Sequence, residues 1–108
     1  MAKKISIVIP NYNGVDILKK TLPNVIKYSQ NAQIIIVDDA SSDKSVTYIH
    51  KHFKKIKVVR LKKNVGFAQA VNKGVYMSDG EYVVLLNSDV SPRRNYIKYA
   101  LRHFDKDR

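Results

Sequence analysis

Three apolar segments of this sequence each end abruptly in amide, hydroxyl or carboxylate side chains. The three endings are Pro-Asn-Tyr-Asn-Gly at residues 10–14, Asp-Asp-Ala-Ser-Ser-Asp at 38–43 and Asn-Ser-Asp at 87–89. Such groups donate and accept hydrogen bonds, and their oxygens are also the ligands that hard divalent cations prefer. Because the pattern occurs three times, we expect the three endings to line one shared site.

The apolar segments are predicted to be strands. They are short and rich in β-branched residues, as in strands that are buried on both faces of a parallel sheet. With one further segment of the same kind, the predicted strands are Ile5–Ile9, Ile34–Val37, Val58–Leu61 and Tyr82–Leu86.

Helical patterns alternate with these strands, and their apolar stripes are predicted to pack on the sheet. The stripes are Val15, Leu18, Leu22, Val25 and Ile26; Val46, Ile49 and Phe53; Phe67, Ala70, Val71, Gly74 and Val75; and Ile97, Ala100, Leu101 and Phe104. Pro23 lacks the N–H that a helix interior needs, so we expect the first helix to kink or restart there. Ser91 and Pro92 are expected to be the N-cap and the first position of the last helix.

Alternation of strands and helices predicts an α/β fold, a Rossmann-like parallel sheet with helices on both faces. With the strand order 3-2-1-4, the carboxyl ends of strands 1, 2 and 4 are neighbours. Ligands of such sheets bind beyond these ends, where the strand order reverses. The three polar endings are therefore predicted to converge on one crevice.

Each ending also has a purely structural explanation. Asp38, Asp39, Ser41 or Ser42 could cap the helix that follows, because Asp and Ser are favoured there. The dipeptide Asn13-Gly14 could be only a turn. Three such endings on three adjacent strand ends favour a binding site over three unrelated structural roles.

Composition indicates the class of protein and of partner. A chain of 108 residues that is 44% hydrophobic fits one domain, residues 1–108. Its net charge of +11 favours an anionic partner: a phosphorylated small molecule, an acidic membrane surface or a nucleic acid. The absence of cysteine excludes disulfides and thiolate metal sites. No apolar run reaches the ~20 residues of a membrane span, so a cytoplasmic protein is expected.

Four motifs, in this order and spacing, resemble the N-terminal, nucleotide-sugar-binding half of a family 2 glycosyltransferase of the GT-A fold. The motifs are SIVIPNYNG, IIIVDDASSD, NVGFAQAVNKG and GEYVVLLNSDV, and the match covers residues 4 to about 92. The resemblance implies inverting transfer of a sugar from a nucleoside diphosphate, a UDP- or dTDP-sugar, to a polysaccharide or a lipid-linked acceptor.

The resemblance also implies roles for individual residues. Pro10 and Tyr12 would form the wall beside the base and ribose, Asp39 would accept a hydrogen bond from the base, and the loop from Asn64 to Gly66 would close over the nucleotide. Asn13, Asn87 and Ser88 would complete the nucleotide site. Asp89 would bind a divalent metal, Mg²⁺ or Mn²⁺, because the sequence Asn-Ser-Asp stands in the place of the family's DxD motif.

The sequence departs from the family in two ways. Asn87 replaces the commoner Asp and offers only a neutral oxygen. Family members with Asn-Ser-Asp at this place resemble the rhamnosyl-type and related cell-surface polysaccharide transferases. The acceptor half of the family's domain, with its general base and its Gln-x-x-Arg-Trp motif, has no counterpart before Arg108. No residue is therefore assigned as the catalytic base, and an incomplete catalytic unit is expected.

Three other functions account for parts of this sequence. A non-catalytic nucleotide-binding fragment remains an alternative. A signalling receiver domain is disfavoured because its acidic pair should follow the first strand, whereas Asp38-Asp39 follows the second. A nucleic-acid-binding module is disfavoured because the basic run at 51–63 spans a helix end, a turn and a strand. Its charge instead suits a diphosphate donor or an anionic membrane surface at the inner membrane face.

The predicted fourth strand also suggests self-association. Residues 82–86 are apolar and include no Lys or Pro that would discourage pairing at a sheet edge. The last helix, with Ile97, Leu101 and Phe104, adds a second apolar surface. We therefore expect a homodimer or a larger assembly through the fourth strand or the last helix.

Overall fold

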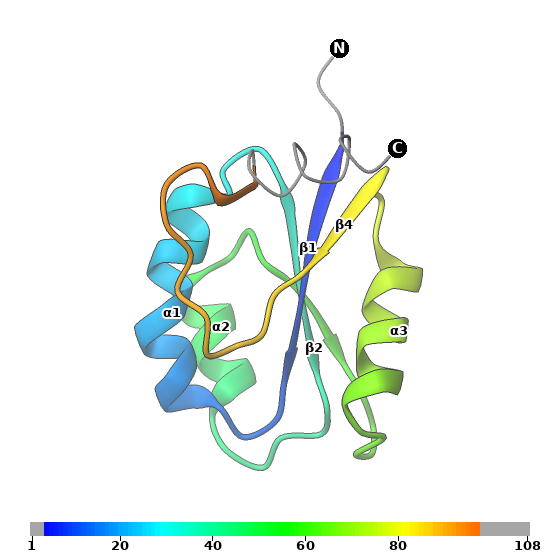
Figure 1. Ribbon diagram of the computed structural model, residues 1–108. Helices are drawn as coiled ribbons and strands as arrows, with labels where there is room; N and C mark the ends of the chain where they lie inside the picture. The colour runs from blue at the N-terminus through cyan, green and yellow to red at the C-terminus, as the bar shows by residue number, and fades with distance from the viewer. Residues whose placement is uncertain (1–3, 98–108) are drawn as a thin grey trace.

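The computed structural model describes residues 4–97 as an α/β unit in which strands and helices alternate (Figure 1). In chain order, the elements are β1 (Ile5–Asn11), α1 (Val15–Tyr28), β2 (Gln33–Asp38), α2 (Ser45–His52), β3 (Lys57–Arg60), α3 (Phe67–Met77) and β4 (Tyr82–Leu85). All neighbouring strands pair in parallel, in the order β3-β2-β1-β4. The predicted fold class and strand order are confirmed.

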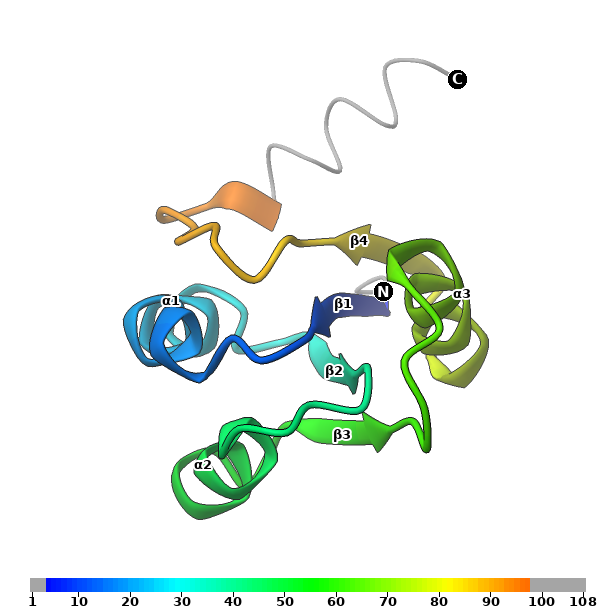
Figure 2. The ribbon, with the colours of Figure 1, turned by 90° about the horizontal axis from the view of Figure 1, so that it is seen from below.

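Helices cover both faces of the sheet (Figure 2). Helices α1 and α2 lie on one face, and α3 lies on the other, over β1 and β2. Alternate residues of β1 supply both cores: Ile7 and Ile9 pack in the larger cluster with α1, while Val8 packs against α3 with Ala70. The central strands β1 and β2 are therefore apolar on both faces, which explains their unbroken apolar sequences.

Of the kink or restart predicted at Pro23, the restart does not occur: helix α1 continues through this residue. It is assigned as one helix over Val15–Tyr28, with Pro23 inside it and exposed. Proline frees the carbonyl four residues earlier, that of Lys19, which is itself an exposed residue. Water can bond a carbonyl on this side of the helix, so the missing hydrogen bond does not break it.

Helix α3 approaches the sheet closely because its buried residues are small. A Cβ atom on Gly74 would lie 2.5 Å from Val8 Cγ1 and 2.7 Å from Val37 Cγ2. Phe67, which the stripe predicted to pack on the sheet, is instead 57% exposed. It is the first residue of the helix, and its ring lies beside Pro10 at the wall of a pocket, not in the core between α3 and the sheet.

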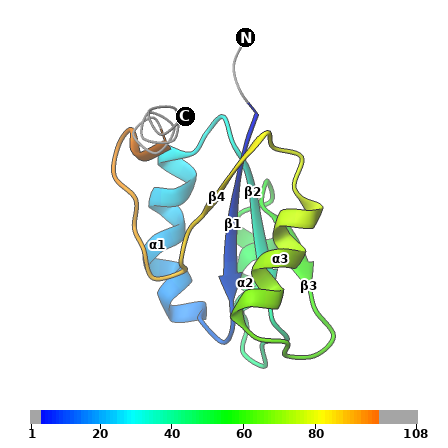
Figure 3. The ribbon, with the colours of Figure 1, turned by 45° about the vertical axis from the view of Figure 1, so that its right-hand side comes forward.

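The segment after β4 runs along α1 (Figures 1 and 3). Thr21 Oγ1 donates to the Ser88 carbonyl at 2.8 Å, Asn24 Nδ2 donates to Ser91 Oγ at 2.7 Å, and the Ser29 and Tyr96 hydroxyls are hydrogen-bonded at 2.5 Å. These contacts hold the segment against one side of the helix.

The predicted helix start at Ser91 and Pro92 is wrong. Both residues lie in irregular backbone, and helical backbone begins only at Tyr96. Asn95 has φ 65°, a left-handed conformation that an α-helix beginning at Pro92 could not contain. Three other residues predicted for this helix, Ala100, Leu101 and Phe104, lie outside the described part of the chain.

Candidate functional site

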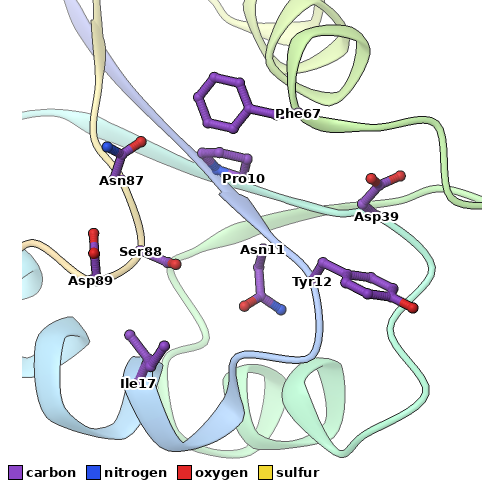
Figure 4. Close-up of a pocket in the computed structure, with 9 residues that line it drawn as sticks. All are labelled: Pro10, Asn11, Tyr12, Ile17, Asp39, Phe67, Asn87, Ser88 and Asp89. Carbon is purple, nitrogen blue, oxygen red and sulfur yellow. The ribbon is translucent and has the colours of Figure 1, made fainter.

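A pocket of about 400 Å³ opens at the carboxyl ends of the strands, where the order of β1 and its neighbours reverses (Figure 4). It is lined by Pro10, Asn11, Tyr12, Ile17, Asp39, Phe67, Asn87, Ser88 and Asp89. Tyr12 and Asp39 lie on one side, and the residues after β4 lie on the other. The pocket therefore draws on the ends of β1, β2 and β4, the three polar endings of the sequence.

Asp39 is a buried carboxylate at the wall of this pocket. It is 5% exposed, and its Oδ1 and Oδ2 accept hydrogen bonds from the N–H groups of Val65 at 2.7 Å and Gly66 at 2.9 Å. Asn64 Nδ2 also donates to the Asp39 carbonyl at 3.2 Å. Charge-assisted bonds of this kind are about twice as strong as neutral ones. Asp39 thus fixes the loop between β3 and α3.

Asp38, the neighbouring carboxylate, serves the scaffold. It is fully buried and accepts hydrogen bonds from Asn11 Nδ2 at 3.0 Å, Ser41 N–H at 3.0 Å and Ser41 Oγ at 2.7 Å. Asn11 Oδ1 is buried and has no hydrogen-bond partner among residues 4–97. A Cβ atom on Gly14 would lie 2.5 Å from this oxygen, so any larger residue there would have to displace the Asn11 side chain.

Asp43 joins the N-termini of α1 and α2. Its Oδ2 accepts from Val15 N–H at 3.1 Å, and its Oδ1 accepts from Ser45 N–H at 2.9 Å and Ser45 Oγ at 2.5 Å. Burial alone would raise the pKa of the Asp43 carboxyl, but these hydrogen bonds outweigh it and hold the pKa below its ordinary value. Asn13 Oδ1 accepts from Ser42 N–H and Asp43 N–H, which ties the β1–α1 loop to the β2–α2 loop.

A tight turn carries the polar residues after β4. Val90 N–H donates to the Asn87 carbonyl at 3.0 Å, so Ser88 and Asp89 are the central residues of the turn. Leu86 N–H donates to the Val8 carbonyl at 3.0 Å and continues the sheet up to the turn. Asp89 is exposed beside the pocket, so its carboxylate can meet a ligand from solvent.

Two aromatic residues line the pocket. Tyr12 and Phe67 are each 57% exposed although they are large; the Phe67 ring lies beside Pro10, and the Tyr12 ring points away from the residues after β4 (Figure 4). Exposed aromatic faces bordering a polar pocket are suited to stacking against a planar ring. The pocket therefore combines flat apolar walls with carboxylate and amide groups.

The predicted site residues fall into two groups. Pro10, Tyr12, Asp39, Asn87, Ser88 and Asp89 line the pocket; Asn13, Asn64 and Gly66 do not, and the last two belong to the loop held by Asp39. Asn11, Ile17 and Phe67 line the pocket without having been predicted. Asn11 belongs to the motif SIVIPNYNG, whereas Ile17 and Phe67 look like ordinary apolar helix residues in the sequence.

The described residues include no cluster of three or more His, Cys, Asp or Glu side chains that could hold a metal ion alone. Asp39 already bonds two backbone N–H groups, so among residues 4–97 Asp89 is the pocket carboxylate that stays available. One carboxylate suits a cation that is shared with a bound phosphate, because Mg²⁺ and ions like it commonly combine one or two carboxylates with substrate oxygens.

The sequence from residue 6 to residue 108 matches the family model described as Glycosyl transferase family 2. The chain belongs to glycosyltransferase family 2. This membership and the sheet order agree with the resemblance drawn from the four motifs. The GT-A fold of the family is also what the structure shows.

Relatives of known name support this membership. The chain is 32% identical over 102 residues to Glycosyltransferase GlyG of Streptococcus pneumoniae, covering 91% of this chain and 34% of that protein. It is 36% identical over 101 residues to TuaG of Bacillus subtilis, a putative teichuronic acid biosynthesis glycosyltransferase, covering 90% and 40%. The chain thus spans about a third of the length of these family members.

Solved structures agree with the sequence relatives. TarS of S. aureus in complex with UDP-GlcNAc superposes with a TM-score of 0.83 at 26% identity, over 95% of this chain and 31% of that one. The mannosyltransferase PcManGT of Pyrobaculum calidifontis, in complex with GDP-Man and Mn²⁺, gives a TM-score of 0.85 at 22% identity, over 94% and 32%. The similarity to PcManGT shows the fold alone.

Within the described residues, no helix is long and apolar enough to cross a membrane.

Proposed function

We propose that this chain is the donor-binding part of an inverting glycosyltransferase and binds a nucleoside diphosphate sugar in the pocket at the strand ends. The observation that carries the proposal is the convergence of Tyr12, Asp39 and Asp89 around this one pocket in a chain of family 2. On this proposal, the base and ribose lie on the side of Tyr12 and Asp39, and the diphosphate lies toward Asp89.

Charge and geometry support this orientation. The Tyr12 ring offers an exposed face for the base, and each Asp39 oxygen keeps a second lone pair after bonding the loop. Asp89 would repel a diphosphate unless a cation lay between them. A divalent metal, Mg²⁺ or Mn²⁺, held by Asp89 and the phosphates would neutralise the charge that develops on the leaving diphosphate.

A uridine or thymidine donor, UDP- or dTDP-sugar, is the proposed substrate class. TarS, the relative at 26% identity, binds UDP and UDP-GlcNAc. The acceptor is proposed to be a cell-surface polysaccharide or a lipid-linked precursor, since TuaG has a putative role in teichuronic acid biosynthesis.

Two partners that would bind outside the pocket are also proposed: an anionic membrane surface and a second copy of the chain. Residues 44–78 include nine Lys and Arg and no Asp or Glu, which suits attraction to an anionic membrane surface from the cytoplasmic side. Strand β4 is an edge strand of the described sheet, with Val83 37% and Leu85 46% exposed, which suits pairing with a second copy. We propose no nucleic-acid partner.

Isothermal titration calorimetry of the chain with UDP-, dTDP- and GDP-sugars, with and without Mn²⁺, tests the donor proposal. We expect a pyrimidine sugar nucleotide to bind, to bind more tightly with Mn²⁺, and to lose that metal-dependent gain in Asp89→Ala. Glu81→Gln, at an exposed carboxylate beyond the opposite end of β4, is the matched control and should retain the gain. An unchanged gain in Asp89→Ala would remove Asp89 from the metal site.

A further inference from the structure

The turn that carries Asp89 needs an anchor. It follows β4, a strand of only four residues at the edge of the described sheet. Two of its hydrogen bonds are backbone bonds: Leu86 N–H to the Val8 carbonyl on the side of β4, and Val90 N–H to the Asn87 carbonyl across the turn. Neither bond fixes how the turn is oriented toward the pocket and α1.

Thr21 of α1 supplies the missing contact. Its Oγ1 donates to the Ser88 carbonyl at 2.8 Å, and Ser88 immediately precedes Asp89. The same oxygen lies 3.2 Å from the Ile17 carbonyl, four residues earlier in the helix. A hydroxyl has one proton, so the shorter contact to Ser88 is the stronger of the two. The turn is therefore tied to the helix that also contributes Ile17 to the pocket.

Burial makes this bond persistent. Thr21 is 6% exposed and lies among the core residues of α1. Water has little access to replace its hydroxyl, and a buried polar group left without a partner is costly. A β-branched residue is not a favoured choice in a helix interior, so the tie to Ser88 gives this residue a role that helix propensity does not.

We infer that Thr21 is a positioning residue for Asp89: its bond to the Ser88 carbonyl holds the turn so that the Asp89 carboxylate faces the pocket. This inference rests on the proposed function for the role of Asp89 as metal ligand. On this inference, α1 controls the metal-dependent part of donor binding, although α1 lies outside the four motifs that resemble the family. Thr21 itself touches neither donor nor metal.

Three variants separate positioning from general stability. Thr21→Val keeps the shape of the side chain and removes the donor, and Thr21→Ser keeps the donor. Asn24→Ala removes the next contact between α1 and the same segment, the bond to Ser91 Oγ, and leaves the turn untouched. The dissociation constant of UDP is measured for each variant with and without Mn²⁺. The readout is the ratio of the constant without Mn²⁺ to the constant with Mn²⁺, which is the gain in affinity that the metal gives.

Thr21→Val should lower this ratio about fivefold, the effect of losing one neutral hydrogen bond, while the affinity without metal stays unchanged. Thr21→Ser should restore the ratio, and Asn24→Ala should leave it at the wild-type value. An unchanged ratio in Thr21→Val, or an equal loss with and without Mn²⁺, would overturn the inference, because Thr21 would then be only a structural residue.

A second measurement needs no ligand. Amide hydrogen exchange of Val90, whose N–H closes the turn, should become about fivefold faster in Thr21→Val, with the core amide of Ile36 unchanged. Unchanged exchange of Val90 would overturn the inference. If the wild-type chain shows no gain from Mn²⁺, the proposed metal role of Asp89 fails, and the exchange of Val90 still decides whether Thr21 holds the turn.

Discussion

Replacement of Asp39 by Asn should destabilise the fold as well as the site. Asp39 accepts one backbone N–H on each carboxylate oxygen, from Val65 at 2.7 Å and from Gly66 at 2.9 Å. Asparagine retains one acceptor oxygen and places an NH₂ group against the other N–H donor. At least one hydrogen bond to a charged group is lost, and such bonds are worth about 1.5–3 kcal/mol. We expect the free energy of unfolding to fall by about this amount.

Urea denaturation of Asp39→Asn, with Glu81→Gln as an exposed control, measures the loss of stability. The same variant should bind nucleotide more weakly by about 1–3 kcal/mol, to the same extent with and without Mn²⁺, because Asp39 is predicted to contact the base. A stability loss below about 0.5 kcal/mol would refute the role of the two backbone bonds. An affinity loss seen only with Mn²⁺ would make Asp39 a metal ligand.

Three further predictions concern the scaffold and its assembly. Gly74→Ala should cost about 1–3 kcal/mol in urea denaturation despite the better helix propensity of Ala, because its Cβ would lie 2.5 Å from Val8 Cγ1; a gain in stability would refute the close packing. Because the pKa of Asp43 is lowered in the folded state, its carboxylate stabilises the fold above its ordinary pKa, and this stabilisation is lost as the pH falls through the lowered pKa. Asp43→Asn should therefore lose less stability on acidification than the wild type, and an unchanged acid profile would contradict this. Val83→Lys should abolish the proposed self-association in sedimentation velocity at high salt, and a wild-type chain that sediments as a 12.4 kDa monomer at high concentration would exclude it.

The order of elements could be predicted from the sequence because it depends on periodicity. Unbroken apolar segments at β1 and β2 reflect burial on both faces, and the polar residues after them mark the strand ends. Three details could not be predicted this way. The effect of Pro23 depends on which side of α1 it occupies, and the start of the last helix depends on the left-handed Asn95. The exposure of Phe67 depends on its place at the first residue of α3, where its ring lines the pocket.

The pocket was predictable only in part, for a similar reason. Asp39 and Asp89 stand at strand ends, which the sequence marks, and both line the pocket. Which carboxylate supports a loop and which stays available depends on hydrogen bonds between residues distant in sequence, such as Asp39 with Val65. Thr21 shows the same limit, since nothing in its local sequence reveals a partner 67 residues away.

Chemical-shift mapping of the ¹⁵N-labelled chain during titration with a UDP-sugar tests directly whether the pocket at the strand ends binds a sugar nucleotide. We expect saturable shifts for the amides of Asn11, Tyr12, Asp39 and residues 87–89, which line or border that pocket. Shifts confined to the separate basic pocket at Arg60 and Lys62, or no saturable shifts at all, would contradict it.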